Sequence, residues 1–230
     1  MNKKDDKNMP ADSQETNNIL KELGVMNLPA GFESDIQYIN IIGSIEGHMI
    51  LPQENKTTKY EHLIPQLVAA EENPEIKGVL LILNTVGGDV EAGLALSEMI
   101  ATMSIPTVSL VLGGGHSIGI PLATSADYSF IAETATMTLH PIRTTGQIIT
   151  SETTFVYLRK TQERVISFIE KHSNAGRETL VKMINRTDDM PNDIGTILFG
   201  QDAVDAGIID EVGGLKQALN KLKEKISKND

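Results

Sequence analysis

The segment at residues 113–119 (GGGHSIG) places a serine, Ser117, between an aliphatic run and a predicted helix. A serine on a sharp turn at the start of a helix suits acyl transfer, because the helix dipole and free N–H groups stabilise a developing oxyanion. Residues 115–119 also match G-x-S-x-G, the nucleophile pattern of α/β hydrolases. Alone this match is weak, since a glycine-rich turn more often only closes a βα unit.

A second glycine pair, Gly87 and Gly88, follows another predicted buried strand. The carboxyl ends of parallel strands lie at one edge of a sheet, where α/β folds bind their ligands. The backbone N–H groups of Gly87 and Ile118 are therefore predicted to point at one oxygen atom from two sides. Such a pair of donors would form an oxyanion hole.

Acyl transfer also needs a general base, and His140 is the best placed of the 5 histidines, because it follows a predicted strand. His48, His62 and His172 are predicted to be surface residues. His116, next to the serine, is predicted to pack or to form local hydrogen bonds.

The elements that must position these residues indicate an α/β fold. Residues 78–83 (GVLLIL) and 107–112 are aliphatic runs typical of strands buried in a parallel sheet. Other strands are predicted at 37–43, 128–132 and 136–139, turns at 84–89 and 113–116, and helices at 60–70, 90–103, from 117, 151–172, 202–206 and 214–228. The alternation of strands and helices predicts parallel βα units with right-handed crossovers.

Both ends of the chain are predicted to be solvated appendages. Residues 1–35 are polar and are expected to form a disordered tail, followed by one domain at residues 36–230. The uncharged stretch 99–126 is long enough to cross a bilayer, but its prolines and glycine run would leave backbone groups unpaired in lipid. We therefore predict a buried strand, turn and helix there, and a cytoplasmic protein.

Composition excludes several kinds of chemistry. The 230 residues include no cysteine, which rules out a disulfide framework, a thiolate zinc site and a thiol nucleophile. The formal net charge of -11 disfavours nucleic acid or an anionic membrane as the main partner. We predict no metal and no cofactor.

The order of these motifs resembles the Clp protease family, the ClpP-type serine peptidases, over residues 37–222. The similar segments are 84–88 (NTVGG, against N-S-P-G-G), 115–119 (GHSIG, the nucleophile segment), 136–141 (TMTLHP, against M-I-H) and 202–210 (DAVDAGIID, against E-A-x-x-x-G-L-I-D). The resemblance implies that Ser117 is the nucleophile, that His140 is the base, and that the N–H groups of Gly87 and Ile118 form the oxyanion hole. The chain looks most similar to the translocation-enhancing, ClpP-like branch of spore-forming bacteria.

The resemblance leaves the third member of the triad open. The family's aspartate falls on Gly195, which has no carboxylate. Asp193 is the preferred choice, followed by Asp189 and then Asp188. A Ser–His dyad without a carboxylate is the alternative.

The resemblance implies a ClpP/crotonase-like fold of stacked parallel βα units. A projecting handle helix at about residues 151–173 would interlock two homo-oligomeric rings. The implied function is that of a serine endopeptidase, ATP-independent or assisted by an ATPase. It would cleave peptides or unfolded or secretory proteins and so aid translocation. Residues 1–18 do not match the family's short N-terminal loop, so docking of an AAA+ unfoldase stays open.

Other readings of the same motifs are possible. An α/β hydrolase would need Asp127 as the acid that precedes its histidine. A signal-peptide-peptidase-like enzyme would pair the serine with a lysine, for which the chain offers Lys160, Lys171 and Lys182. A crotonase relative would bind acyl-CoA without using Ser117. A ClpP-like scaffold would bind unfolded or presecretory proteins without cutting them.

Overall fold

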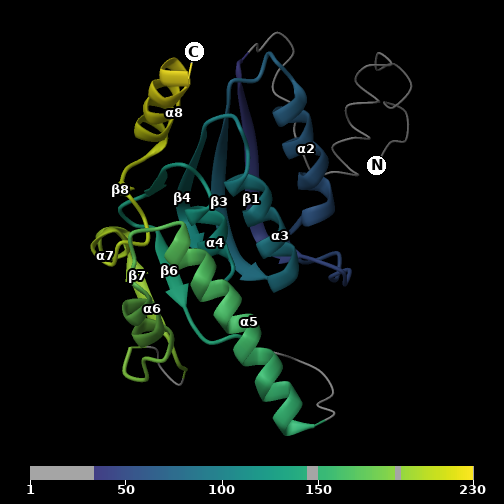
Figure 1. Cartoon of the computed structure of the whole chain (residues 1–230), viewed down its shortest axis with the longest axis vertical. Coiled ribbons are helices and arrows are strands. Elements are labelled where there is room, and N and C mark those ends of the chain that lie inside the picture. The colour runs from purple at the N-terminus through teal and green to yellow at the C-terminus, as the bar shows by residue number, and fades with distance from the viewer. Residues whose placement is uncertain (1–33, 144–149, 190–192, 230) are drawn as a thin grey trace, which may run out of the picture. The chain divides into compact units, whose positions relative to one another are not determined.

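A mostly parallel sheet with the strand order β2-β1-β3-β4-β5-β8 forms the centre of the fold (Figure 1). Its strands are β1 (Ile36–Glu46), β2 (Thr57–Lys59), β3 (Gly78–Gly88), β4 (Thr107–Gly115), β5 (Ser129–Ile131) and β8 (Glu211–Val212). The computed structural model describes residues 34–143, 150–189 and 193–229. The predicted disordered tail at residues 1–35 lies almost wholly outside these residues.

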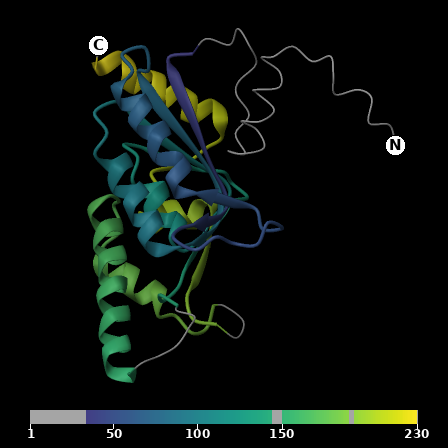
Figure 2. The ribbon, with the colours of Figure 1, turned by 90° about the vertical axis from the view of Figure 1, so that its right-hand side faces the viewer.

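Helices cover both faces of this sheet. The helices are α2 (Tyr60–Glu72), α3 (Val90–Ala101), α4 (Gly119–Thr124), α5 (Ser151–Lys171), α6 (Arg177–Ile184), α7 (Gly200–Asp205) and α8 (Leu215–Asn229). The larger apolar cluster joins one face of the sheet to α2, α3, α4 and α5, and the smaller one joins the opposite face to α8. The first half of α5 extends well beyond the end of the sheet (Figures 1 and 2).

A short antiparallel pair brings the segments of the predicted site together. β6 (Thr136–Leu139) pairs with β7 (Thr196–Phe199) in antiparallel register, and it contacts β4 through Gly114 and Thr136. The Ser117 N–H donates to the Thr138 carbonyl at 2.8 Å. The residues that follow β4 and β6 therefore lie side by side.

The predicted α/β fold of parallel βα units is confirmed, with corrections at several elements. Residues 84–88 and 113–115 are not turns but the last residues of β3 and β4, and the helix after the serine begins at Gly119. β2, α6, β7 and β8 were not predicted. The C-terminal helix is not a solvated appendage: Ala218, Leu222 and Ile226 of α8 are buried against the sheet.

The uncharged stretch 99–126 contributes the end of α3, then β4 and α4. Several of its aliphatic side chains, including those of Leu110 and Leu122, are fully buried in the protein core, whereas Leu112 is exposed. Within the described ranges, no helix combines the length and the apolar character that a bilayer-spanning segment needs.

Candidate active site

Ser117 occupies a strained turn between β4 and α4. Its φ of 56° makes it the one residue other than glycine with positive φ in the described part of the chain. Such a conformation costs free energy for a residue with a side chain, and strained residues of this kind concentrate at functional sites. The turn is held by the bond from the Ser117 N–H to Thr138 and by the Ile120 N–H, which donates to the Ser117 carbonyl at 3.0 Å.

Gly87, near the end of β3, packs directly on this turn. A Cβ atom on Gly87 would lie 2.8 Å from the Ser117 Cβ and 2.9 Å from the His116 carbonyl oxygen. The φ of Gly87 is also positive, at 87°. Both facts require glycine at this position, because a side chain there would push against the serine.

The two predicted oxyanion donors differ in their hydrogen bonds. The Ile118 N–H, at the N-cap of α4, donates to no other atom among the described residues. The Gly87 N–H donates to Thr85 Oγ1 at 3.1 Å. Ile118 therefore offers a free donor beside Ser117, whereas Gly87 must exchange its bond to Thr85 before it can bind an oxyanion.

His140 directly follows the last residue of β6, and it lines the same small cavity as Ser117. Its Nδ1 atom lies 2.8 Å from the carbonyl oxygen of the next residue, Pro141. A carbonyl can only accept a hydrogen bond, so Nδ1 carries the proton in this contact. In the neutral ring Nε2 is then the acceptor, which is the form that a general base needs.

The cavity beside Ser117 is small and mostly apolar. Besides the serine and the histidine it is lined by Ile118, Ile120, Leu139, Ile142, Gln162, Val165, Ile169 and Ile184. Its volume of about 20 Å³ holds about one water molecule. As it stands, the cavity is too small to hold a substrate side chain.

His116 forms a local contact, as predicted. Its Nδ1 atom lies 2.8 Å from Thr138 Oγ1, and the ring is half-buried. Burial lowers the pKa of His116, and the nearby charge of His140 lowers this pKa further. A neutral His116 adds no second positive charge beside His140.

The candidate carboxylates have other partners. Asp193 Oδ2 lies 2.6 Å from Arg143 Nη2, and its Oδ1 accepts from the Ile194 N–H at 2.8 Å. Hydrogen bonding by that N–H and the charge of Arg143 lower the pKa of Asp193, and a smaller contribution comes from the charge of His140. The Asp193 carboxylate is bonded to Arg143 and to the Ile194 N–H, and its catalytic role stays a prediction.

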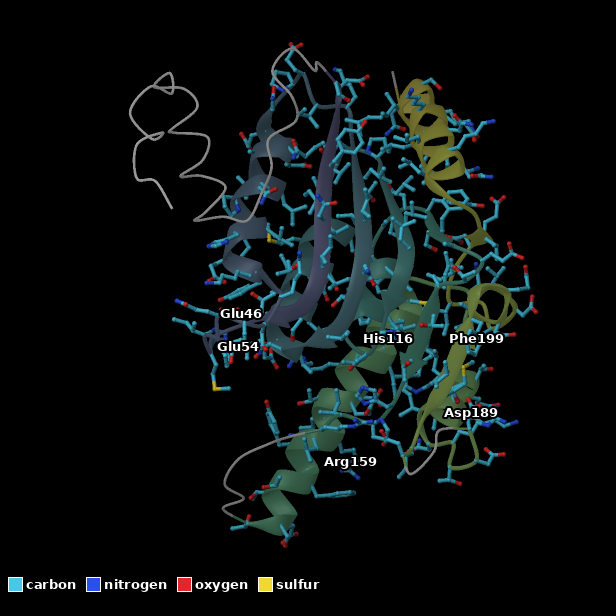
Figure 3. The ribbon with its side chains drawn as sticks, turned by 180° about the vertical axis from the view of Figure 1, so that it is seen from behind. Glu46, Glu54, His116, Arg159, Asp189 and Phe199 are labelled. Atoms are coloured by element: carbon cyan, nitrogen blue, oxygen red, sulfur yellow. The ribbon has the colours of Figure 1, made fainter. Side chains whose placement is uncertain are left out.

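The other two carboxylates lie near the ends of α6 and β7. Asp189 accepts from the Ile197 N–H at 3.0 Å, and Asp188 pairs with Arg186 at 2.8 Å. Figure 3 shows Asp189 well apart from His116, the neighbour of the serine. Neither carboxylate has a bond to His140 among the described residues.

Gly195, the position that corresponds to the family's aspartate, touches the base through its backbone. A Cβ atom on Gly195 would lie 2.2 Å from the Leu139 carbonyl oxygen and 3.0 Å from the His140 Cβ. Gly195 is buried and its φ is 141°. The main chain at Gly195 therefore packs against the backbone and Cβ of His140, and this position supplies no side-chain carboxylate.

Sequence reasoning missed Gln162 and Arg143. Gln162 lies on α5, and its Oε1 accepts from the Ile142 N–H at 2.7 Å. In the sequence it is one of several polar residues on an amphipathic helix. It lies three residues before Val165 and seven before Ile169, and this helical spacing is the one signal that places it at the edge of the buried face. Nothing in the sequence pairs Arg143 with Asp193.

The additional residues that the alternative enzyme classes would require do not line the cavity beside Ser117. Asp127 accepts from the Thr107 N–H at 2.8 Å, at the opposite end of β4 from Ser117. Lys160, Lys171 and Lys182 are exposed, and none of them lines the cavity beside Ser117. His48 is exposed as predicted, whereas His172 is half-buried with its Nε2 atom out of contact with water, which corrects its prediction as a surface residue.

No cluster of three or more His, Asp or Glu side chains suited to a metal ion occurs within residues 34–143, 150–189 and 193–229.

Comparisons with known proteins support the family resemblance. The sequence profile of the Clp protease family matches residues 33–216. The chain is 59% identical over 209 residues to the translocation-enhancing protein TepA of Halalkalibacterium halodurans. The aligned region covers 91% of this chain and 82% of that protein. It is 27% identical over 157 residues to the ATP-dependent Clp protease proteolytic subunit of Lactococcus lactis, covering 65% of this chain and 74% of that one. Proteolytic subunit 1 of the Chlamydia abortus ATP-dependent Clp protease is 25% identical over 142 residues, 58% of this chain and 69% of that subunit. The residues matched by the profile include both glycine-rich strand ends, the serine turn and His140, so this chain belongs to the Clp protease family.

Proposed function

We propose that the protein is a serine endopeptidase that cleaves peptides or unfolded proteins through an acyl-enzyme on Ser117. The observation that carries the proposal is the placement of Ser117. It has positive φ on a turn between a buried strand and a helix, and it shares a cavity with His140. A surface serine in an ordinary turn would have neither feature.

The proposed reaction uses residues of this chain alone. His140 Nε2 takes the proton of the Ser117 hydroxyl, and Oγ attacks the peptide carbonyl carbon. The resulting oxyanion accepts hydrogen bonds from Ile118 and Gly87. His140 then gives its proton to the leaving amine, and a water molecule, deprotonated by the same ring, releases the acyl group. Asp193 as the third member stays a prediction.

The proposed substrates follow from the relatives and from the cavity. The TepA relative carries a name for enhanced translocation, so we propose presecretory or other unfolded proteins as substrates, in the cytoplasm. Aliphatic side chains line the cavity beside Ser117, which favours an apolar residue next to the cleaved bond. Whether an ATP-dependent unfoldase delivers the substrate stays open.

We also propose that the protein forms homo-oligomeric rings that interlock through α5. Phe155 and Tyr157, near the start of this helix, are 65% and 59% exposed, so both aromatic side chains are available to a neighbouring copy. Sedimentation of the full chain should give a mass several times 25.0 kDa. A single 25.0 kDa species at working concentration would contradict the ring.

A scaffold without peptidase activity is the second candidate. Two observations favour it: the cavity of about 20 Å³ admits no substrate side chain as it stands, and no carboxylate among the described residues bonds to His140. Cleavage of casein and of short peptides separates the two functions. The peptidase proposal expects cleavage that disappears in Ser117→Ala and His140→Ala, whereas a scaffold binds casein equally well in all three proteins and cuts it in none.

A further inference from the structure

We propose that Gln162 is a positioning residue for His140, acting through the peptide group between Pro141 and Ile142 in place of a triad carboxylate. The inference rests on the proposed peptidase function. In this proposal a side chain of α5 keeps the His140 ring in the tautomer that carries its proton on Nδ1.

The first link is the contact of His140 with Pro141. The Nδ1–H of His140 donates to the Pro141 carbonyl at 2.8 Å. In a Ser–His–Asp triad the carboxylate accepts the same proton, and so keeps the imidazole in the tautomer whose Nε2 can take the serine proton. The Pro141 carbonyl accepts the Nδ1 proton as the carboxylate would, but it carries no negative charge.

The second link is Gln162. Its Oε1 accepts from the Ile142 N–H at 2.7 Å. This N–H and the Pro141 carbonyl belong to one planar peptide group, in which a trans bond points C=O and N–H in opposite directions. Fixing the N–H therefore fixes the direction of the carbonyl. Gln162 and His140 consequently bind the two sides of the same rigid unit.

The surrounding residues leave this peptide group as the available partner of Nδ1. Gly195 packs with its main chain against the Cα and Cβ atoms of His140, since a Cβ atom at Gly195 would lie 3.0 Å from the His140 Cβ, and it supplies no carboxylate. Asp193 is bonded to Arg143 at 2.6 Å and to the Ile194 N–H at 2.8 Å. The nearest predicted carboxylate is thus engaged away from the ring.

Gln162 also lines the cavity shared by Ser117 and His140. Its side chain therefore belongs to the same site as the two proposed catalytic residues.

The test compares rates of labelling by a fluorophosphonate probe in the full-length protein. Gln162→Leu keeps the size of the side chain and removes the acceptor, and we expect a decrease on the order of 10- to 100-fold, by analogy with the loss of a hydrogen-bond partner that orients a metal-ligating histidine. Gln162→Glu retains the acceptor and should stay within about threefold of wild type. Gln66→Leu is the matched control, because this α2 glutamine donates to the carbonyl of His62 and does not line the cavity beside Ser117.

Asp193→Asn provides the opposing measurement. The inference predicts a smaller decrease in labelling rate than in Gln162→Leu, whereas loss of a true triad aspartate lowers the rate by about 10⁴-fold. A large loss in Asp193→Asn together with an unchanged rate in Gln162→Leu would overturn the inference and leave the peptidase proposal standing. A wild-type protein that takes up no probe at Ser117 would remove the peptidase proposal itself.

A spectroscopic readout separates positioning from general structure. In the wild type, ¹H–¹⁵N correlation spectra of the neutral His140 ring should show the proton on Nδ1, and in Gln162→Leu a share of it should move to Nε2. This measurement also decides the matter if Gln162→Leu folds poorly, because a wild-type ring protonated at Nε2 contradicts the inference.

Discussion

The main chain of Gly87 packs against the side chain of Ser117, 30 positions later in the sequence. A Cβ atom placed on Gly87 would lie only 2.8 Å from the Ser117 Cβ. The contact joins the end of β3 to the turn after β4. It explains why glycine is required at position 87, and it keeps an N–H donor beside the serine.

Gly87→Ala should therefore inactivate the site. The new methyl group would press on Ser117 and would also be strained by the φ of 87°. Displacing the serine and one oxyanion donor should slow probe labelling by about 100- to 1,000-fold. Gly176→Ala is the control, because a Cβ atom at Gly176 meets nothing within 4 Å. Equal labelling rates in the two variants would contradict the proposed oxyanion geometry.

Stability should fall as the pH drops below about 6.5, the ordinary pKa of histidine. Burial lowers the pKa of His172, aided by the charge of Lys171, and burial lowers the pKa of His116 as well. The unfolded chain then takes up protons at a higher pH than the folded one. The stabilisation is complete above the unfolded pKa and is lost as the pH falls towards the folded pKa, by at most about 1.4 kcal/mol per pH unit for each histidine.

His172→Phe tests this origin of the pH dependence. The ring of His172 stacks on Phe168 with centroids 4.3 Å apart, and phenylalanine preserves that contact. The variant should lose part of the slope of unfolding free energy between pH 7 and pH 5, measured by urea titration. Carboxylates with lowered pKa, such as Glu91, act at lower pH. An unchanged slope in His172→Phe would mean that His172 does not contribute.

Leu222→Ala should show that α8 is part of the core. Leu222 is 0% exposed and packs in the cluster on the second face of the sheet. Removing a buried leucine side chain costs about 2–5 kcal/mol of unfolding free energy. The exposed neighbour Lys223 is the control, and Lys223→Ala should change stability by less than about 0.5 kcal/mol. Similar small effects in both variants would contradict the packing of α8.

The ion pair between α3 and α5 should contribute little to stability. Arg164 binds Glu91 through two hydrogen bonds, of 2.5 and 2.9 Å, but both side chains are about half exposed. A double-mutant cycle with Arg164→Gln and Glu91→Gln should give a coupling energy of about 0.2–1 kcal/mol that decreases with added salt. A coupling of several kcal/mol would mean that the pair fixes the handle helix in place.

The parts of the fold that the sequence predicts are those with local signals. The aliphatic run at 78–83 and the helix break at Pro106 locate β3 and β4, and with them the two glycine-rich strand ends. β7 has only four residues, and it exists because it pairs with β6, a contact across about 60 positions that no local pattern reveals. The same holds for α8, whose lysines suggest a solvated helix until the sheet beneath its apolar face is known.

In the candidate site, too, the residues with local sequence signals could be predicted, and those defined by distant contacts could not. Ser117 and His140 stand out because each follows a strand in a recognisable segment, and the structure brings both to one cavity. The surroundings of the base depend on distant residues. Arg143 binds Asp193 across 50 positions, and Gln162 reaches Ile142 across 20. A carboxylate near the right place in the sequence therefore does not establish that it contacts the histidine.

Mapping the adduct of a fluorophosphonate probe by mass spectrometry tests the central claim most directly. The account predicts one covalent adduct per chain on Ser117, absent from Ser117→Ala and formed much more slowly in His140→Ala. A protein that remains unlabelled, or an adduct on another serine that persists in Ser117→Ala, would contradict the account.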